Sequence, residues 1–219
     1  MPRGVRPILA LFCAALGLIV NLGSALPQES GLPKFGRDTV LVWKSQNQSV
    51  ENEMVVRIAS FQPDRYIEWE NATTQGTVFM PARAVREGKN FINSRLFEGG
   101  VDTRGNNATT LWLSEKTFQD LKARGKVKLA LDSVDCWMTL LEREQMSILV
   151  NRSPMDLPVV KVGDDRGSVR WFLDADDNPL MVKHTIRAFS QFLASITTDR
   201  SDTLRWIKGR KLTNPPQRR

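Results

Sequence analysis

Apolar and polar positions alternate in short segments along most of the chain, and this pattern predicts a mainly β protein. Runs rich in Val, Ile, Trp, Tyr and Phe are separated by Asn, Gly, Pro and Ser, which is typical of strands joined by turns. The predicted strands in the first half are residues 39–44, 53–61, 65–70 and 77–80. Those in the second half are residues 126–132, 137–141, 146–150, 157–162, 168–173 and 180–186, with a hairpin turn at GDDRG, residues 163–167.

One segment, LWLSEKTFQDLKARG at residues 111–125, carries helical signals instead. Ser114 suits the N-cap, and Gly125 suits the position just after the last turn. Acidic and basic residues fall in the first and last turns, where they complement the helix dipole. Leu113 and Phe118 are spaced for a hydrophobic staple. We therefore expect a short helix over Glu115–Arg124 that packs on the sheet.

Two segments leave the choice of structure open. Residues 84–92 suit either a short helix or a strand, and a loop rich in Gly and Asn follows over residues 99–107. Residues 186–196 favour a strand, although their large apolar residues also fit one face of a helix.

These elements together predict one β-rich domain over residues 38–200. The expected fold class is an antiparallel sandwich or a partly open barrel with one short α-helix. Residues 26–37, LPQESGLPKFGR, mix Pro, Gly and polar residues and indicate an N-terminal linker.

Residues 1–25 have the pattern of a secretory signal peptide. Arg3 and Arg6 precede the apolar run Ile8–Val20, and the small residues that follow suit cleavage after Ala25. Cys136 is then the one cysteine left, so the exported chain has no internal disulfide. This combination favours a periplasmic or secreted protein of a bacterial cell envelope.

The formal net charge is +7, but the excess lies at the two ends of the chain. Residues 201–219 carry six basic residues against Asp202, and the leader carries Arg3 and Arg6, so residues 26–200 balance to zero. A balanced body gives no indication of nucleic-acid binding. For the basic tail, residues 201–219, we expect either a solvated, disordered end or peripheral contact with anionic membrane lipids.

The stretch WFLDADDNPL, residues 171–180, raises the question of a calcium loop. An EF-hand would take ligands from Asp174, Asp176 and Asn178, and needs Gly at its sixth position and an acid at its twelfth. Pro179 and Thr185 stand there instead. We therefore expect a turn between strands, in which Asp and Asn accept hydrogen bonds from local backbone amides.

No complete catalytic set is present. Asp102 and Asp132 stand in near misses of the aspartic-protease turn, each without its Gly. Cys136 and His184 could form a thiol–imidazole pair, but Cys136 is expected to be a small buried apolar residue and His184 a strand residue. One Cys and one His also leave too few ligands for a zinc, iron or copper site, and there is no phosphate-binding glycine loop. We predict no catalytic residues, no metal site and no cofactor.

Together, the leader, the β-rich body and the segments LWLSEKTFQDLKARGKVKLALD, NRSPMDLPVVKV and WFLDADDNPLMVK resemble a group of exported bacterial β-rich proteins. The resemblance covers residues 110–185. It implies export and a β-rich fold. The function of the group is not established, and no catalytic residue is carried over.

Two functions are expected from these features. The first is a non-enzymatic exported protein that binds a cell-envelope component or a protein partner. The alternative is a carrier for an apolar, lipid-like ligand held in a half-open β-sheet and lined by Trp and Phe. An enzyme is the third and least favoured class, and the oligomeric state stays open.

Overall fold

The computed structural model describes residues 31–47, 50–93, 96–97, 99–100 and 102–199. The predicted signal peptide, its cleavage site and the basic tail lie outside the described residues. Within them, residues 31–36 of the predicted linker have no regular secondary structure.

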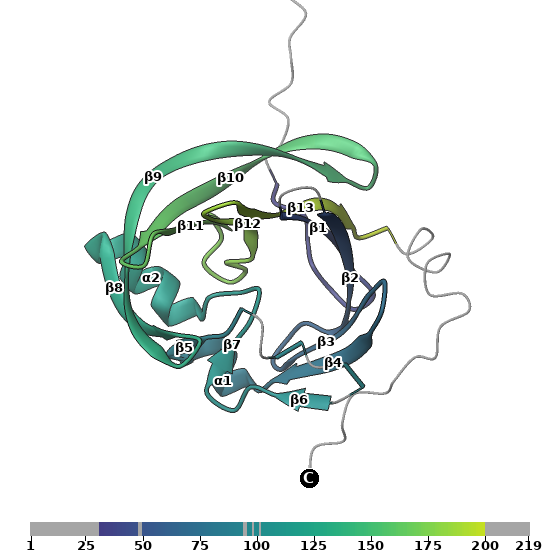
Figure 1. Cartoon of the computed structure of the whole chain (residues 1–219), viewed down its shortest axis with the longest axis horizontal. Helices are drawn as coiled ribbons and strands as arrows, with labels where there is room; N and C mark the ends of the chain where they lie inside the picture. Colours follow the sequence, from purple (N-terminus) through teal and green to yellow (C-terminus); the bar gives the residue numbers. More distant parts are fainter. Residues whose placement is uncertain (1–30, 48–49, 94–95, 98, 101, 200–219) are drawn as a thin grey trace, which may run out of the picture. The chain divides into compact units, whose positions relative to one another are not determined.

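Most described residues belong to one curved sheet, drawn in Figure 1. Its strands lie in the order β6-β4-β3-β2-β1-β13-β12-β11-β10-β9-β8-β5-β7, and most neighbours are antiparallel. The mainly β fold is therefore confirmed, as a single sheet that does not close. The strands are β1 Val40–Asn47, β2 Val50–Ser60, β3 Arg65–Asn71, β4 Gln75–Met80, β5 Asn90–Phe91, β6 Asp102–Arg104, β7 Ala108–Thr109, β8 Lys126–Leu131, β9 Val134–Val150, β10 Ser153–Asp164, β11 Ser168–Leu173, β12 Met181–Ile186 and β13 Phe189–Thr197.

The two ends of the sheet approach each other without pairing. β6 and β7 lie at opposite ends of the strand order, yet only residues 105–107 separate them in the chain. So short a connection spans at most about 15 Å. The amide of Gly105 donates to the carbonyl of Phe79 in β4, and the amide of Ala108 donates to the carbonyl of Gly105. The sheet is thus a partly open barrel with its gap beside residues 105–107.

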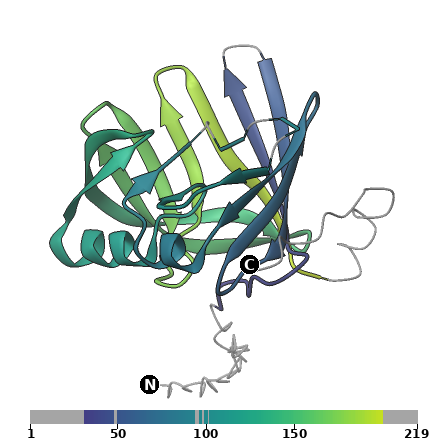
Figure 2. The same ribbon diagram turned by 90° about the horizontal axis from the view of Figure 1, so that it is seen from below.

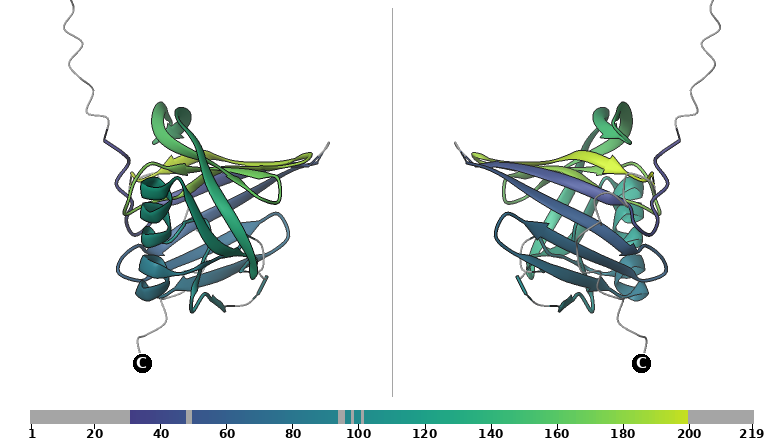
Figure 3. Two further views of the ribbon diagram at one scale, coloured as in Figure 1. Left: turned by 90° about the vertical axis from the view of Figure 1, so that its left-hand side faces the viewer. Right: turned by 90° about the vertical axis from the view of Figure 1, so that its right-hand side faces the viewer.

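The prediction of two strands at residues 137–141 and 146–150 was wrong, because β9 runs unbroken through both. The polar stretch Glu142–Gln145 suggested a break. In the structure these residues lie on the solvent-exposed part of the long β9–β10 hairpin, where polar side chains suit a strand. The end of this hairpin pairs with β13, Ser195 beside Leu149, and Figures 1 and 3 show it reaching across the sheet.

The predicted helix is confirmed as α2, Glu115–Arg124. The Ser114 hydroxyl oxygen accepts from the amide of Thr117 at 3.3 Å, and Gly125 adopts φ +70° while its amide donates to the carbonyl of Leu121. A second, six-residue helix, α1, spans Ala82–Glu87 in the segment where the sequence left helix and strand open. Residues 187–188 turn the chain into β13, so the strand favoured for residues 186–196 is also confirmed.

The hairpin turns and the helices lie at opposite ends of the curved sheet, as Figure 2 shows. We call these the turn end and the helix end. The β10–β11 and β12–β13 turns lie at the turn end, and α1, α2 and the β11–β12 loop lie at the helix end. No helix within the described ranges is long and apolar enough to cross a membrane.

Candidate functional site

Alternation along each strand gives the sheet an inner and an outer face. Leu41 and Trp43 of β1 are fully buried, and they share the inner face with Val56 of β2 and Trp69 of β3. The outer face of the same region carries Lys44 and Phe192, which are paired partners on β1 and β13. The inner face holds most of the apolar core, so a ligand enclosed by the sheet would contact this face.

Five polar residues form a continuous row on the inner face. They come from five neighbouring strands, and each is paired in register with the next: Arg170, His184, Gln191, Ser45 and Asn52. Each stands two residues from its strand's end at the turn end of the sheet. We call this set the polar row. Arg170 and His184 are buried, Gln191 and Ser45 are half-buried, and Asn52 is exposed, so the row leads from the interior to solvent.

An apolar layer lies directly below the polar row, toward the helix end. It consists of Phe172, Leu193, Trp43 and Met54, which follow the polar row by one inward-facing position on their strands. Phe172 contacts Phe91 of β5 edge to face, with ring centroids 6.0 Å apart. The inner face therefore changes from hydrogen-bonding groups to apolar groups over one step of the strand alternation.

The buried end of the polar row is an ion pair with a histidine beside it. Arg170 Nη1 lies 2.5 Å from Oδ2 of Asp164, and both side chains are at most 2% exposed. Asp164 also accepts from the amides of Arg166 and Ser168. Burial alone would raise the pKa of Asp164, but the bond to Arg170 and these amides lower it. The carboxylate therefore stays ionised and balances the guanidinium.

His184 is neutral in this setting. Burial is the main cause that lowers its pKa to about 4, and the positive charge of Arg170 adds to it, while Asp164 acts in the opposite direction. The imidazole contacts the ring of Phe189 at 5.9 Å between centroids. A neutral imidazole has one nitrogen that donates and one that accepts.

Several buried polar atoms on the inner face have no hydrogen-bond partner among the described residues. Two belong to the polar row, Arg170 Nε and His184 Nε2, two are indole nitrogens, Trp43 Nε1 and Trp69 Nε1, and a fifth is Nε of Arg65 at the helix end. Leaving such a group unsatisfied costs about 1–3 kcal/mol. Each such group in a folded protein calls for an explanation, such as a bound water, an ion or a functional role.

Cys136 does not form a pair with His184. Its thiol donates to the carbonyl of Trp137 at 3.7 Å and lies beside Asp165, whereas His184 is in β12, three strands away from β9 in the strand order. Burial, with the nearby carboxylates of Asp165 and Asp164, raises the pKa of the thiol to about 11. This thiol is therefore protonated at neutral pH and is a poor nucleophile.

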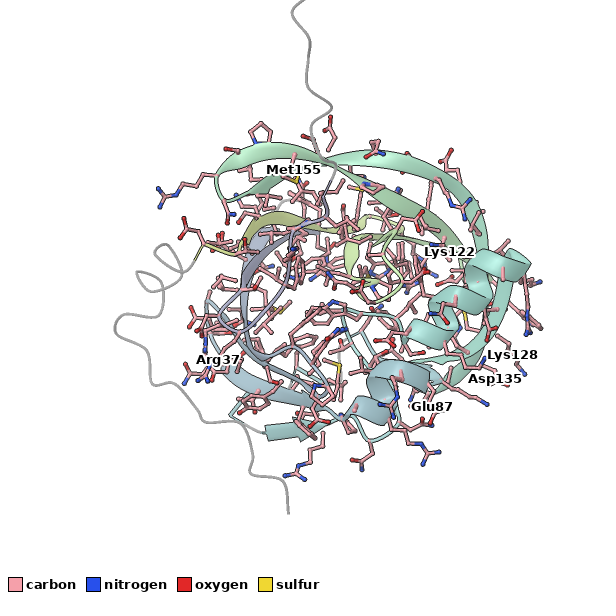
Figure 4. All side chains as sticks on the ribbon, turned by 180° about the vertical axis from the view of Figure 1, so that it is seen from behind. Arg37, Glu87, Lys122, Lys128, Asp135 and Met155 are labelled. Atoms are coloured by element: carbon pink, nitrogen blue, oxygen red, sulfur yellow. The ribbon has the colours of Figure 1, made fainter. Side chains whose placement is uncertain are left out.

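The acids of WFLDADDNPL contact a helix rather than local amides, which corrects the expected partners. The ammonium of Lys122 on α2 lies 2.7 Å from Asp174 Oδ1 and 2.9 Å from Asp176 Oδ1. Asn178 Oδ1 accepts from the indole of Trp112 at 2.8 Å. Figure 4 shows Lys122 turned toward this loop, whereas Lys128 and Asp135 lie on the outer side. The segment is still the turn between β11 and β12.

The two near misses of the aspartic-protease turn lie in separate elements. Asp102 begins β6, and Asp132 lies in the β8–β9 turn, where its Oδ1 accepts from the amide of Asn93. Across the described part of the chain, no group of three or more His, Cys, Asp or Glu residues is arranged to hold a metal ion.

A second buried arginine lies at the helix end of the inner face. The guanidinium of Arg65 stacks between Phe61 and Trp112, 4.5 and 4.7 Å from the ring centroids, and donates to the carbonyl of Asp177 at 3.4 Å. Burial lowers its pKa to about 10, against the opposing effect of Glu115 and Asp177. Arg65 thereby joins β3 to Trp112 and the β11–β12 loop, and we assign it a structural role.

No protein-family model matches the chain, and a search of curated proteins finds no match either. The polar row and the apolar layer therefore rest on geometry alone. Sequence patterns missed the row because its members come from five strands, and only the register brings them together. Of the tryptophans, Trp43, Trp69 and Trp112 are buried, Trp171 is 9% exposed, Trp137 is 42% exposed, and Trp206 lies outside the described residues.

Proposed function

We propose that this protein is an exported, non-enzymatic binding protein for an amphiphilic component of the bacterial cell envelope. The ligand's apolar chain would contact the apolar layer, and its polar group would contact the polar row. This proposal joins the two functions expected from the sequence, because an amphiphile is both an envelope component and a lipid-like ligand. Periplasmic or secreted location is part of the proposal and rests on the pattern of residues 1–25.

The observation that carries the proposal is the order of the two layers. A binding site for an amphiphile needs apolar surface in its depth and a few placed polar groups at its mouth. The apolar layer supplies the first, with Met54 half-buried and Trp43 and Leu193 buried beside it, and the polar row supplies the second through residues that range from buried to exposed. Arg170 Nε and His184 Nε2 provide hydrogen-bonding atoms that no described residue satisfies.

Binding to membranes would be assisted by the basic tail, which we propose as a peripheral contact with anionic lipid. Its net positive charge would attract a negatively charged surface and raise the local concentration of the protein there. The tail would deliver the protein to the source of its ligand without itself forming the site.

The test uses N-phenylnaphthylamine, an uncharged apolar fluorophore whose emission rises in apolar surroundings. We expect purified protein to bind it, and amphiphiles with a 12-carbon chain to displace it. The variant Met54→Glu places a charge in the apolar layer and should weaken fluorophore binding by about tenfold, or about 1.4 kcal/mol.

Phe192→Glu is the matched control, because Phe192 is an apolar residue of similar position on the outer face and is already 38% exposed. It should leave the affinity for the fluorophore within about twofold, since a charge on the solvated outer face does not reach the inner layer. Absence of binding to the unchanged protein, or equal loss in both variants, would contradict the proposal.

A further inference from the structure

The charges around the polar row are already balanced. Arg170 is the one charged member, and its guanidinium is paired with the buried carboxylate of Asp164. His184 is neutral, because burial lowers its pKa to about 4. Gln191, Ser45 and Asn52 carry no charge. The net charge of the row together with Asp164 is therefore zero.

The nearest lysines do not change this balance, because they lie on the opposite face. Lys183 and Lys161 both place their ammonium groups over the ring of Trp171, at 4.7 and 5.6 Å from its centroid. Trp171 is the neighbour of Arg170 in β11 and faces outward, where its indole donates to Glu144. A charged head group on the inner face would meet no unpaired opposite charge in the row.

An anionic head group would also meet Asp164. A carboxylate or phosphate that approached Arg170 would compete with Asp164 for the same guanidinium, and the two negative charges would repel each other in a buried setting. Removing an ion from water is unfavourable when no oppositely charged partner is free to pair with it. A cation would face the corresponding repulsion from Arg170.

The hydrogen-bonding groups of the row are a mixture of donors and acceptors. Arg170 Nε donates, the neutral imidazole and the amides of Gln191 and Asn52 both donate and accept, and the Ser45 hydroxyl does the same. Hydroxyl and amide groups of a ligand also donate and accept, so they match this mixture, whereas a carboxylate only accepts.

From this balance we infer that the polar row selects an uncharged head group rich in hydroxyl or amide groups, as in a glycolipid or an acylglycerol. The inference rests on the proposed function, because it concerns the head group of the same ligand. An apolar layer alone would not discriminate between head groups. Here the discrimination depends on which polar groups of the row and of the head group are left without a hydrogen-bond partner.

The test compares four probes that share a 12-carbon chain: dodecyl maltoside, dodecylphosphocholine, dodecanoate and dodecyltrimethylammonium. Each probe is added below its critical micelle concentration, and its displacement of N-phenylnaphthylamine is measured. We expect dodecyl maltoside to displace the fluorophore at about tenfold lower concentration than dodecanoate or the ammonium probe, because only the ions lose hydration without gaining a partner. Equal or better displacement by dodecanoate overturns the inference while leaving the proposed function intact, whereas no displacement by any probe overturns both.

The variant Asp164→Asn tests the origin of the preference. It leaves the positive charge of Arg170 unbalanced, so displacement by dodecanoate should improve by about tenfold while displacement by dodecyl maltoside changes little. Asp156→Asn makes the same charge change at an exposed position in β10 and should change neither.

A second variant covers the case in which Asp164→Asn does not fold. Gln191→Lys adds a positive charge to a half-buried position of the row and leaves the ion pair in place. It should likewise improve displacement by dodecanoate relative to dodecyl maltoside. If a folded variant of either kind leaves the ratio of the displacing concentrations of dodecanoate and dodecyl maltoside unchanged, the row does not set the specificity and the inference is wrong.

Discussion

Trp112 donates its indole N–H to Oδ1 of Asn178 across 2.8 Å, and both side chains are buried. The bond joins the segment before α2 to the β11–β12 loop, 66 residues further along the chain. Asn178→Ala should lower the free energy of unfolding by about 1–3 kcal/mol, because it leaves the indole N–H buried without an acceptor. Denaturation in urea measures the loss.

Trp112→Phe and the double variant complete a cycle that isolates the bond. Removing donor and acceptor together should cost less than the sum of the two single losses, with a coupling of about 1 kcal/mol. Additive losses would mean that the two residues act through packing and not through this bond.

The behaviour of WFLDADDNPL illustrates what the sequence could and could not predict. Its turn followed from Pro, Asp and Asn between two apolar runs, and α2 followed from its caps, since these signals are local. The partners of Asp174 and Asn178 were not predictable, because Lys122 and Trp112 are distant in sequence. A side chain that can bond local amides bonds a distant group when the fold brings a stronger partner within reach.

Lys122 should hold the β11–β12 loop against α2. Replacing Asp174 and Asp176 together with Ala should lower stability by about 1 kcal/mol, because it removes three partly exposed ion pairs: those of Lys122 with both carboxylates and that of Arg143 with Asp174. The melting temperatures of the unchanged protein and of the double variant, compared with each other, measure this loss. Neither melting temperature should change when calcium is added.

Lys116→Ala provides the control for that change, since Lys116 pairs with Asp120 on the exposed side of the same helix. It should shift the melting temperature less than the double variant does. A calcium-dependent rise in the melting temperature of the unchanged protein, lost on removal of the two aspartates, would instead identify the loop as a metal site.

Acid should destabilise the protein through the buried polar row. The pKa of His184 falls from 6.5 in the unfolded chain to about 4 in the fold, so the unfolded state takes up a proton first as the pH falls. The stability should therefore decrease by about 1–3 kcal/mol between pH 6.5 and 4. Asp164, whose pKa is lowered, adds to the loss at still lower pH.

Chemical denaturation at a series of pH values measures this slope, and His184→Gln should flatten it above pH 4. His184 is the single histidine of the chain, so its ring proton signals can be followed by NMR without ambiguity. A titration centred near 6.5 would show that the imidazole is solvated and not part of a buried row.

Register explains why the candidate site was less predictable than the fold. The strands themselves follow from alternation, and most were located from the sequence. Below the polar row, toward the helix end, two irregularities, one between Val42 and Trp43 and one between Trp171 and Phe172, shift the pairing of β1 with β13 and of β11 with β12. A one-residue shift exchanges the inner and outer faces, so which residues meet across strands cannot be derived from one strand at a time.

The thiol of Cys136 should be unreactive in the folded protein. Its side chain is 1% exposed, and burial raises its pKa from 9.0 to about 11. Both effects reduce the thiolate that attacks a disulfide reagent, so the reaction with dithiobisnitrobenzoate at pH 8 should be at least about a hundredfold slower in the folded protein than in urea. The measurement uses protein purified without residues 1–25, in which Cys136 is the single cysteine.

Thr139→Cys in a Cys136→Ala background places one thiol on an exposed position of the same strand and should react at the rate of the unfolded chain. Fast reaction of Cys136 in the folded protein would restore a nucleophilic role for this residue and argue against a purely binding function.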